Sequence, residues 1–330
     1  MMQDVYKELV GRTNLDIPVT TLLERVTEHF GLGAIIRHEP ILEGYEDLNI
    51  KLKTDSGKYV VKAFSKEKRL ENHQDYVRAL VELPKAGVPV AKIIRAGDDS
   101  HILRISGSKG DTLTIVMEFF EGKSFDHSKP GVGDVRKLTC YIARFHNAKF
   151  SVSRNYDSWG AANLLEEFEK KKNYLSAGDL ALVRPIVKEF RDADFSNSRL
   201  RKCVIHGDIQ RKHVLKDNKG NYCILDLGCM DYSHAIFDIG VFLATFAFNA
   251  KSASGYEKTF RLVVAEYQKA NKLNDEELNR IHLAAKACYC TYLLSSSYLL
   301  ATGNRSQETL DWLEFARRGL RVHRDLNIAV

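Results

Sequence analysis

Two aspartates, each just after a short apolar run, are the clearest candidates for catalytic residues in this sequence. Asp208 ends the tripeptide His-Gly-Asp that follows the apolar run at residues 204–205, and Asp226 follows the run at residues 222–225. Runs of this kind indicate buried strands. Residues 217–221 read Asp-Asn-Lys-Gly-Asn, a composition typical of tight turns. We therefore predict a strand–turn–strand hairpin that carries both carboxylates to the same end of the structure.

Two carboxylates placed in this way suit phosphoryl transfer. One orients a substrate hydroxyl and accepts its proton, and the other holds the magnesium ion that bridges the nucleotide phosphates. The kinase catalytic loop reads His-Arg-Asp, four further residues, Asn, and later the metal-binding Asp. Here the loop reads His206-Gly-Asp208, four residues and His213, with Asp226 later. The alternative interpretation is that strand-terminal aspartates serve only as caps and turn residues.

With glycine in its second place, this loop resembles that of the aminoglycoside phosphotransferase and choline kinase family. The resemblance covers nearly the whole chain from about Leu22, and residues 22–64 look most like homoserine kinase-type members. It implies an α+β, two-lobed protein kinase-like fold. The N-lobe, with an antiparallel sheet that binds the nucleotide, would span residues 1–121. The mainly helical C-lobe, with the catalytic loop, metal site and substrate pocket, would span residues 122–330.

The resemblance also implies a function and the residues that carry it. The chain would be an ATP-dependent phosphotransferase that acts, with Mg²⁺, on a hydroxyl group of a small molecule. The family's acceptors are amino alcohols, aminoglycoside-like antibiotics and related metabolites, and the choice between ATP and GTP stays open. Asp208 would be the catalytic residue, and His213 and Asp226 the metal ligands.

The N-lobe supplies the expected nucleotide contacts. Gly44 lies in a turn between two predicted strands, where the family places its phosphate-binding loop. Lys62 lies in a third, apolar strand, from which a lysine reaches the α- and β-phosphates. A helix predicted at residues 66–83 carries Glu67, Glu71 and Asp75 on one face, and of these three we expect Glu71 to pair with Lys62. The alternative for Lys62 is an edge-strand lysine that faces solvent.

The predicted strand at residues 113–119 leads into the segment that joins the lobes. In kinases the backbone N–H and C=O groups of this hinge meet the adenine edge, so its side chains can be apolar. The residues in the corresponding places here are Glu118 and Phe120. We therefore expect both to contribute to ATP binding.

In the predicted C-lobe, three polar residues have expected roles outside the chemical step. His146 lies on the apolar stripe of a helix, where histidine usually packs and hydrogen-bonds. Asp238 would bond the backbone of the catalytic loop or cap the following helix. Asp231 would point into the substrate pocket. Helices predicted at residues 164–175 and 180–190 form the insert where the family commonly builds that pocket.

His213 departs from the family pattern, which has asparagine there. An amide oxygen suits magnesium, whereas a histidine nitrogen suits manganese or zinc better. Three interpretations follow: magnesium is held mainly by Asp226 with slower turnover, Mn²⁺ is preferred, or the chain is a weak or inactive pseudokinase that binds nucleotide or a partner. The presence of Asp208 and Lys62 favours a working kinase. A protein kinase is disfavoured because no Ala-Pro-Glu segment follows Asp226.

Composition bounds the class of protein. The chain has 330 residues, long for a single core, and a net charge of +6, which suits an anionic ligand such as ATP but gives no evidence for nucleic acid. The longest apolar run, residues 239–248, is too short to span a bilayer. Six cysteines without a Cys-x-x-Cys motif indicate buried free thiols. We expect a cytoplasmic protein without membrane or nucleic-acid partners and leave the oligomeric state open.

Overall fold

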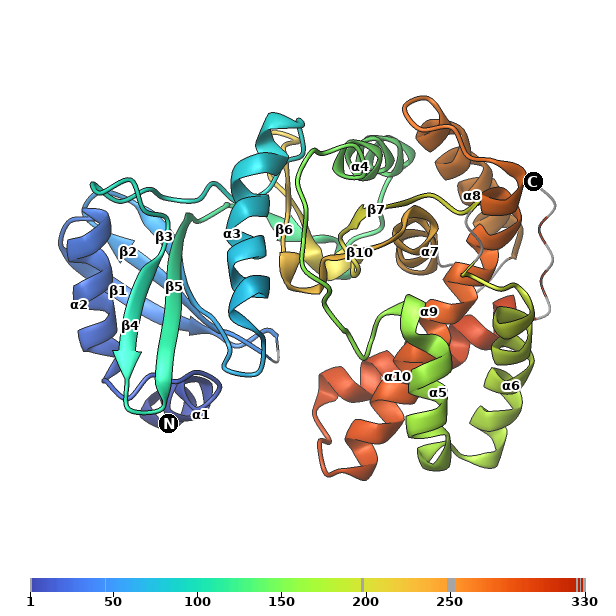
Figure 1. Ribbon diagram of the computed structural model, residues 1–330, viewed down its shortest axis with the longest axis horizontal. Helices are drawn as coiled ribbons and strands as arrows, with labels where there is room; N and C mark the ends of the chain where they lie inside the picture. The colour runs from blue at the N-terminus through green and yellow to red at the C-terminus, as the bar shows by residue number, and fades with distance from the viewer. Residues whose placement is uncertain are drawn as a thin grey trace. The chain divides into compact units, whose positions relative to one another are not determined.

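The computed structural model divides into two compact units (Figure 1). It describes residues 2–44, 46–196, 199–247, 253–324, 326 and 328. The N-terminal unit consists of Met1–Lys85, Pro89–Lys123 and Leu215–Gly228. The C-terminal unit consists of Ala86–Val88, Ser124–Val214 and Cys229–Val330. The N-terminal unit thus includes the segment Leu215–Gly228 in addition to the lobe expected at residues 1–121.

A five-stranded antiparallel sheet, in the order β1-β2-β3-β5-β4, forms the frame of the N-terminal unit. Alternate residues of its second strand are fully buried, as expected for a strand with one face on a core. The antiparallel sheet expected for the N-lobe is confirmed. The strands are β1 (Ile35–Ile41), β2 (Leu48–Thr54), β3 (Lys58–Ala63), β4 (Leu103–Gly107) and β5 (Gly110–Glu118).

Helices cover both faces of this sheet (Figure 1). The unit contains α1 (Met2–Val10), α2 (Val19–Phe30) and α3 (Leu70–Lys85). The apolar stripe of α2 packs with Val61 of β3 in one core cluster. Neighbouring strand residues point to opposite faces, so Lys62 points to the other side, where its Nζ lies 5.1 Å from the ring centre of Tyr76 on α3. The sheet therefore separates an apolar core from the face that carries Lys62.

The expected hairpin between the strands at residues 204–205 and 222–225 is wrong. The strand β7 (Lys202–Ile205) pairs with β10 (Asp231–His234), and both belong to the C-terminal unit. The turn at residues 217–221 instead joins β8 (Val214–Lys216) to β9 (Tyr222–Ile224), in a small sheet with β6 (Lys123–Ser124). The reason is that the chain leaves the sheet after Ile205 and begins a new strand only at Val214, beyond the 3₁₀ turn Arg211–His213.

The C-terminal unit is mainly helical, as expected. Its longest helix, α9, begins with a capping box formed by Asn274 and Glu277 and packs against α5, α6, α7 and α10. Every residue of α7 is buried. The helices are α4 (Val132–Phe145), α5 (Leu164–Lys171), α6 (Ala177–Asp192), α7 (Ala235–Phe246), α8 (Ala253–Gln268), α9 (Asp275–Ala301) and α10 (Gln307–His323).

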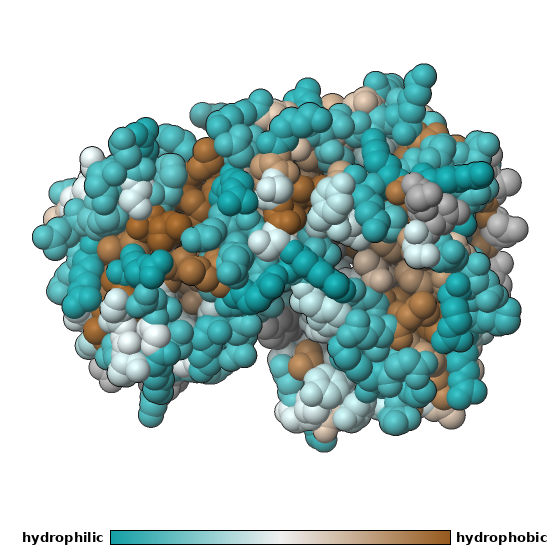
Figure 2. All heavy atoms as spheres, viewed as in Figure 1, coloured by the Kyte–Doolittle hydropathy of each residue, from teal (hydrophilic) through white to brown (hydrophobic). Residues whose placement is uncertain are grey.

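Hydrophilic residues cover most of the face shown in Figure 2, with hydrophobic patches between them. No helix within the described ranges is long and apolar enough to cross a membrane. The apolar run expected at residues 239–248 forms part of α7, and its last residue, Phe248, lies outside the described residues. All six cysteines are free thiols; four are buried, whereas Cys140 and Cys229 are partly exposed.

Candidate active site

The loop that carries Asp208 turns sharply at Gly207. Its φ is +85°, a backbone conformation that favours glycine. A Cβ atom at this position would lie 2.3 Å from the carbonyl oxygen of Cys229. Glycine in the second place of the motif is therefore required by the path of the chain.

Asp238, on the buried helix α7, fixes this loop through hydrogen bonds to its backbone. Its Oδ2 accepts a hydrogen bond from the His206 N–H (2.7 Å), and its Oδ1 accepts one from the Gly207 N–H (2.8 Å). His146 Nε2 lies 2.9 Å from the same Oδ2, and its Nδ1 lies 2.7 Å from the Tyr267 hydroxyl. Burial alone would raise the pKa of Asp238, but these hydrogen bonds hold it below its usual value. The structural roles expected for Asp238 and His146 are confirmed.

The carboxylate of Asp208 has a hydrogen-bond donor on each oxygen. The hydroxyl of Tyr292, from α9, donates to Oδ1 (2.8 Å), and Nε2 of Gln210 donates to Oδ2 (3.0 Å). Nδ1 of His213 lies 2.9 Å from the backbone carbonyl oxygen of Asp208 and 3.3 Å from its Oδ2. The structure thus brings two expected site residues, Asp208 and His213, together. The metal-binding role of His213 stays a prediction.

Sequence reasoning missed both donors. Gln210 lies inside the motif but at a position that the motif leaves free. Tyr292 lies far along the chain in a helix whose residues from 281 to 297 are all buried, so no periodicity marks it. Burial and the charge of Asp208 raise the pKa of Tyr292 well above its usual value, which keeps the phenol a hydrogen-bond donor. Only the fold could have revealed this contact.

In the N-terminal unit, Lys62 forms a buried ion pair with Asp47. Nζ of Lys62 lies 2.5 Å from Oδ2 of Asp47, and the two side chains are 7% and 13% exposed. The other oxygen of Asp47 accepts the Ser65 N–H at 2.8 Å, and Asn49 Oδ1 lies 3.4 Å from Nζ. Burial alone would lower the pKa of Lys62, but the charges of Asp47 and Asp226 raise it above its usual value. Lys62 is therefore a cation whose position is fixed by its ion pair with Asp47.

The expected pairing of Glu71 with Lys62 is wrong. Glu71 lies exposed in the first turn of α3, whereas the residue of α3 that faces Lys62 is Tyr76. Positions five apart on a helix differ by about 140° around its axis, so both cannot face one target. Asp47 takes the place of the partner because it directly precedes β2, which pairs with β3. The sequence could have indicated this partner, because Asp47 is an acidic residue directly before the strand that neighbours Lys62.

Asp226 lies near the end of the segment Leu215–Gly228. Its backbone is in the left-handed conformation, with φ of +59°. Its Oδ1 accepts the Gly228 N–H at 3.3 Å, and Nζ of Lys68 donates to the Gly228 carbonyl at 2.6 Å. Carboxylate oxygens fit magnesium, whereas the imidazole of His213, in the other unit, suits manganese better. Within the described part of the chain, no group of three or more His, Cys, Asp or Glu side chains gathers as a metal site.

The remaining expected nucleotide residues lie at the ends of strands. Gly44 forms an exposed turn with φ of +93°, and its carbonyl accepts a hydrogen bond from Arg12 at 2.8 Å. Glu118 ends β5, and its N–H donates to the carbonyl of Lys92 at 2.8 Å. Phe120 follows, partly exposed. Their contacts with ATP stay predictions.

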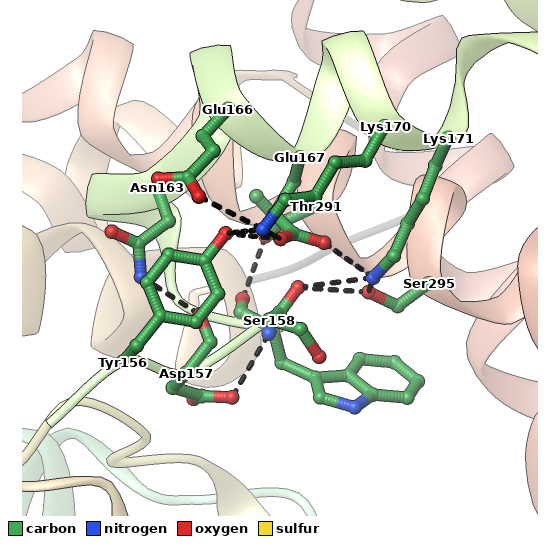
Figure 3. A network of polar contacts seen from close by, with 11 residues as sticks. Tyr156, Asp157, Ser158, Asn163, Glu166, Glu167, Lys170, Lys171, Thr291 and Ser295 are labelled. Carbon is green, nitrogen blue, oxygen red and sulfur yellow. Dashed lines mark hydrogen bonds and ion pairs between the residues drawn. The ribbon is translucent and has the colours of Figure 1, made fainter.

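A loop at residues 155–160 lies against α9 (Figure 3). Thr291 Oγ1 donates to the Trp159 carbonyl at 2.8 Å, and Ser295 Oγ donates to the Ser158 carbonyl at 2.9 Å. The Trp159 ring lies edge-to-face with the Tyr292 ring at 5.6 Å. The same turn of α9 therefore holds both this loop and the carboxylate of Asp208.

A buried ion pair supports the contact between the loop and α9. Nζ of Lys171 lies 2.5 Å from Oε2 of Glu167 and 2.9 Å from Oγ of Ser295. Figure 3 shows both Lys171 and Ser295 directed towards Ser158. Lys171 and Glu167 are 7% and 1% exposed. Burial of this kind makes the pair costly to break.

Aromatic and acidic groups gather around Tyr292. Besides Trp159, the ring of Trp312 from α10 lies 5.1 Å from it, and both indoles are partly exposed. The charge of Asp157 contributes to the raised pKa of Tyr292, after burial and the charge of Asp208. Asp231, expected in the substrate pocket, accepts the N–H of Asn155 at 3.1 Å and so anchors the start of the loop. Two partly exposed indole rings therefore flank the tyrosine that donates a hydrogen bond to Asp208.

Comparison with known proteins identifies the family and the fold of this chain. The pattern of the phosphotransferase enzyme family matches residues 37–273. A homoserine kinase of Methylocella silvestris is 23% identical over 276 residues, which cover 81% of this chain and 82% of that protein.

Two solved structures share the fold. An amicoumacin kinase in complex with AMP-PNP, Ca²⁺ and Ami has a TM-score of 0.71 and 14% identity over 96% of each chain. A microcompartment-associated aminopropanol kinase has a TM-score of 0.65 and 14% identity, over 91% of this chain and 95% of that one. The resemblance and the kinase-like fold expected from the sequence are confirmed. Because the family pattern spans more than half of its length, the chain belongs to the phosphotransferase enzyme family.

Proposed function

We propose that this protein transfers the γ-phosphoryl group of ATP to a hydroxyl group of a small amino alcohol. The observation that carries the proposal is the carboxylate of Asp208, held on a loop that Asp238 fixes through two backbone hydrogen bonds. Such a carboxylate is the group that phosphoryl transfer needs to orient an acceptor hydroxyl.

The reaction proceeds by in-line displacement. The acceptor oxygen bonds to the γ-phosphorus, and its proton passes to the carboxylate of Asp208. The bond between the γ-phosphorus and the bridging oxygen breaks, and ADP leaves with that oxygen. Asp208 thus serves as orienting group and proton acceptor.

The nucleotide side of the reaction rests on the N-terminal unit. Lys62, a cation held by Asp47, binds the phosphates, and Gly44 contributes backbone groups to the same task. The backbone at Glu118 and Phe120 meets the base. Asp226 and His213 would hold a divalent metal ion, which neutralises phosphate charge when bound.

Two observations support an amino alcohol as acceptor. Trp159, Trp312 and Asp157 gather near Asp208 through Tyr292, and aromatic faces with a carboxylate attract an ammonium group. The relative and one of the solved structures described above are named as kinases of homoserine and aminopropanol, which both carry an amino group and a hydroxyl group. Homoserine is therefore the first acceptor to test.

The test is ADP release from ATP with homoserine, aminopropanol, choline, a sugar and an aminoglycoside, in Mg²⁺ and separately in Mn²⁺. We expect acceptor-dependent turnover with an amino alcohol, and its loss by about a thousandfold or more in Asp208→Asn. His213→Asn should shift the metal preference towards Mg²⁺. Absence of turnover with every acceptor, together with no thermal shift on adding ATP, would overturn the proposal.

A further inference from the structure

We infer that Tyr292 is a positioning residue: with Gln210, it holds the carboxylate of Asp208 in the orientation from which that carboxylate receives the acceptor's proton. The inference rests on the proposed function. It adds a residue of α9 to a catalytic apparatus that the sequence motif confines to the loop at residues 206–213.

The first support is the geometry of the carboxylate. Tyr292 donates to Oδ1 at 2.8 Å and Gln210 donates to Oδ2 at 3.0 Å. A carboxylate with one donor on each oxygen cannot rotate about its last bond without losing both hydrogen bonds. Oδ1, which accepts from Tyr292, keeps a further lone pair, so the carboxylate remains able to accept a proton from a substrate hydroxyl.

The second support is that Tyr292 itself cannot turn away. Its side chain is 3% exposed, and its ring lies edge-to-face with Trp159 at 5.6 Å and with Trp312 at 5.1 Å. Rings in such contacts have little freedom to change rotamer. The hydroxyl is therefore presented to Asp208 from a fixed direction.

The third support is the way α9 is held. Thr291 and Ser295, on either side of Tyr292, donate to backbone carbonyls of the loop at residues 155–160, and Lys171 reinforces the contact at Ser295 (Figure 3). These bonds set the register of α9 against the loop. A shift of the helix would therefore displace the Tyr292 hydroxyl and the loop together.

The experiment compares Tyr292→Phe with Tyr289→Phe. Tyr289 is buried in the same helix, and its hydroxyl donates to the Ala244 carbonyl at 2.8 Å, so this control loses a similar hydrogen bond without touching Asp208. We expect Tyr292→Phe to lower kcat about tenfold to a hundredfold, the size expected when a hydrogen bond to a charged group is lost, and to leave KM for ATP within about twofold. Tyr289→Phe should leave both parameters close to those of the wild type.

A double-mutant cycle separates positioning from a general structural effect. In an Asp208→Asn background, Tyr292→Phe should have almost no further effect on the residual rate, because the group that it positions is already gone. Equal and multiplicative losses in the two backgrounds would overturn the inference. So would a wild-type kcat in Tyr292→Phe.

Folding of each variant is checked by thermal unfolding. Should Tyr292→Phe fail to fold, Gln210→Leu removes the donor from the other oxygen and replaces it in the same cycle, with the same expected dependence on Asp208. An additive result for Gln210→Leu would overturn the paired-donor arrangement. Failure of the proposed function looks different, because the wild type would then show no acceptor-dependent turnover at all.

Discussion

The Asp47 carboxylate lies 2.5 Å from Nζ of Lys62, so the sheet itself, rather than α3, supplies the partner of this lysine. Asn49, which is the register partner of Lys62 on the neighbouring strand, lies 3.4 Å from the same nitrogen. The position of the cation is therefore set by β2 and β3. Movement of α3 need not disturb the Lys62–Asp47 pair.

Replacing Asp47 by asparagine should destabilise the protein and impair ATP use together. Both side chains are largely buried, and removal of one partner leaves an uncompensated buried charge, which costs about 3–5 kcal/mol. Urea unfolding measures the loss, and KM for ATP should rise in protein that remains folded. The control is Glu121→Gln, which breaks the exposed pair with Lys58 and should change neither quantity appreciably. An unchanged unfolding midpoint in Asp47→Asn would contradict the assignment.

Replacing Asp238 by asparagine should destabilise the catalytic loop in a pH-dependent way. The pKa of Asp238 in the folded protein is lowered from its ordinary value of 3.8. Its stabilisation is therefore fully present above pH 3.8 and is lost as pH falls through the lower folded value. Wild type and variant should differ by about 2–4 kcal/mol at neutral pH. The difference should shrink below about pH 4, and urea unfolding at pH 7, 5 and 3.5 measures it. A difference that grows in acid would contradict the sign.

Replacing Gly207 by alanine should be far more damaging than the same change at Gly220. Both glycines have positive φ, +85° and +82°, so both variants incur left-handed strain of about 1–2 kcal/mol. At Gly220 a Cβ atom meets nothing within 4 Å, whereas at Gly207 it would lie 2.3 Å from the carbonyl oxygen of Cys229. The temperature of thermal unfolding and kcat should both fall sharply only in Gly207→Ala. Equal effects in the two variants would show that backbone strain alone matters.

The sequence was sufficient where the family resemblance names the residues. The loop of Asp208 was recognised from its motif, and the structural roles of Asp238 and His146 were expected although their contacts join residues 32 and 92 positions apart. The pairing of β7 was not predictable in the same way, because strand partners are chosen over long distances in the chain. The pairing turned out to be with β10.

The partner of Lys62 and the role of Tyr292 depended on tertiary structure. Several acidic residues lie at a suitable distance in sequence from Lys62. The orientation of α3 turns Glu71 away from it, whereas the pairing of β2 with β3 brings Asp47 beside it. Tyr292 lies in a helix whose residues are buried on nearly every side, so hydrophobic periodicity cannot distinguish a functional hydroxyl there. Residues that act across helices in this way become visible only when the helices are placed.

Replacing Lys171 by methionine should weaken acceptor binding without changing ATP binding. Lys171 joins Glu167 and Ser295, and through Ser295 it supports the loop that bears Trp159 (Figure 3). Methionine preserves the apolar length but removes the ammonium group that lies 2.5 Å from the buried carboxylate of Glu167, so stability should fall by about 3 kcal/mol. In folded enzyme at low temperature, KM for the acceptor should rise severalfold while KM for ATP stays unchanged. The control is Lys188→Met, which removes an exposed ion pair with Asp192 outside this network and should leave acceptor KM near that of the wild type. Equal rises in both KM values for Lys171→Met would mean that the network supports the fold in general rather than the acceptor loop.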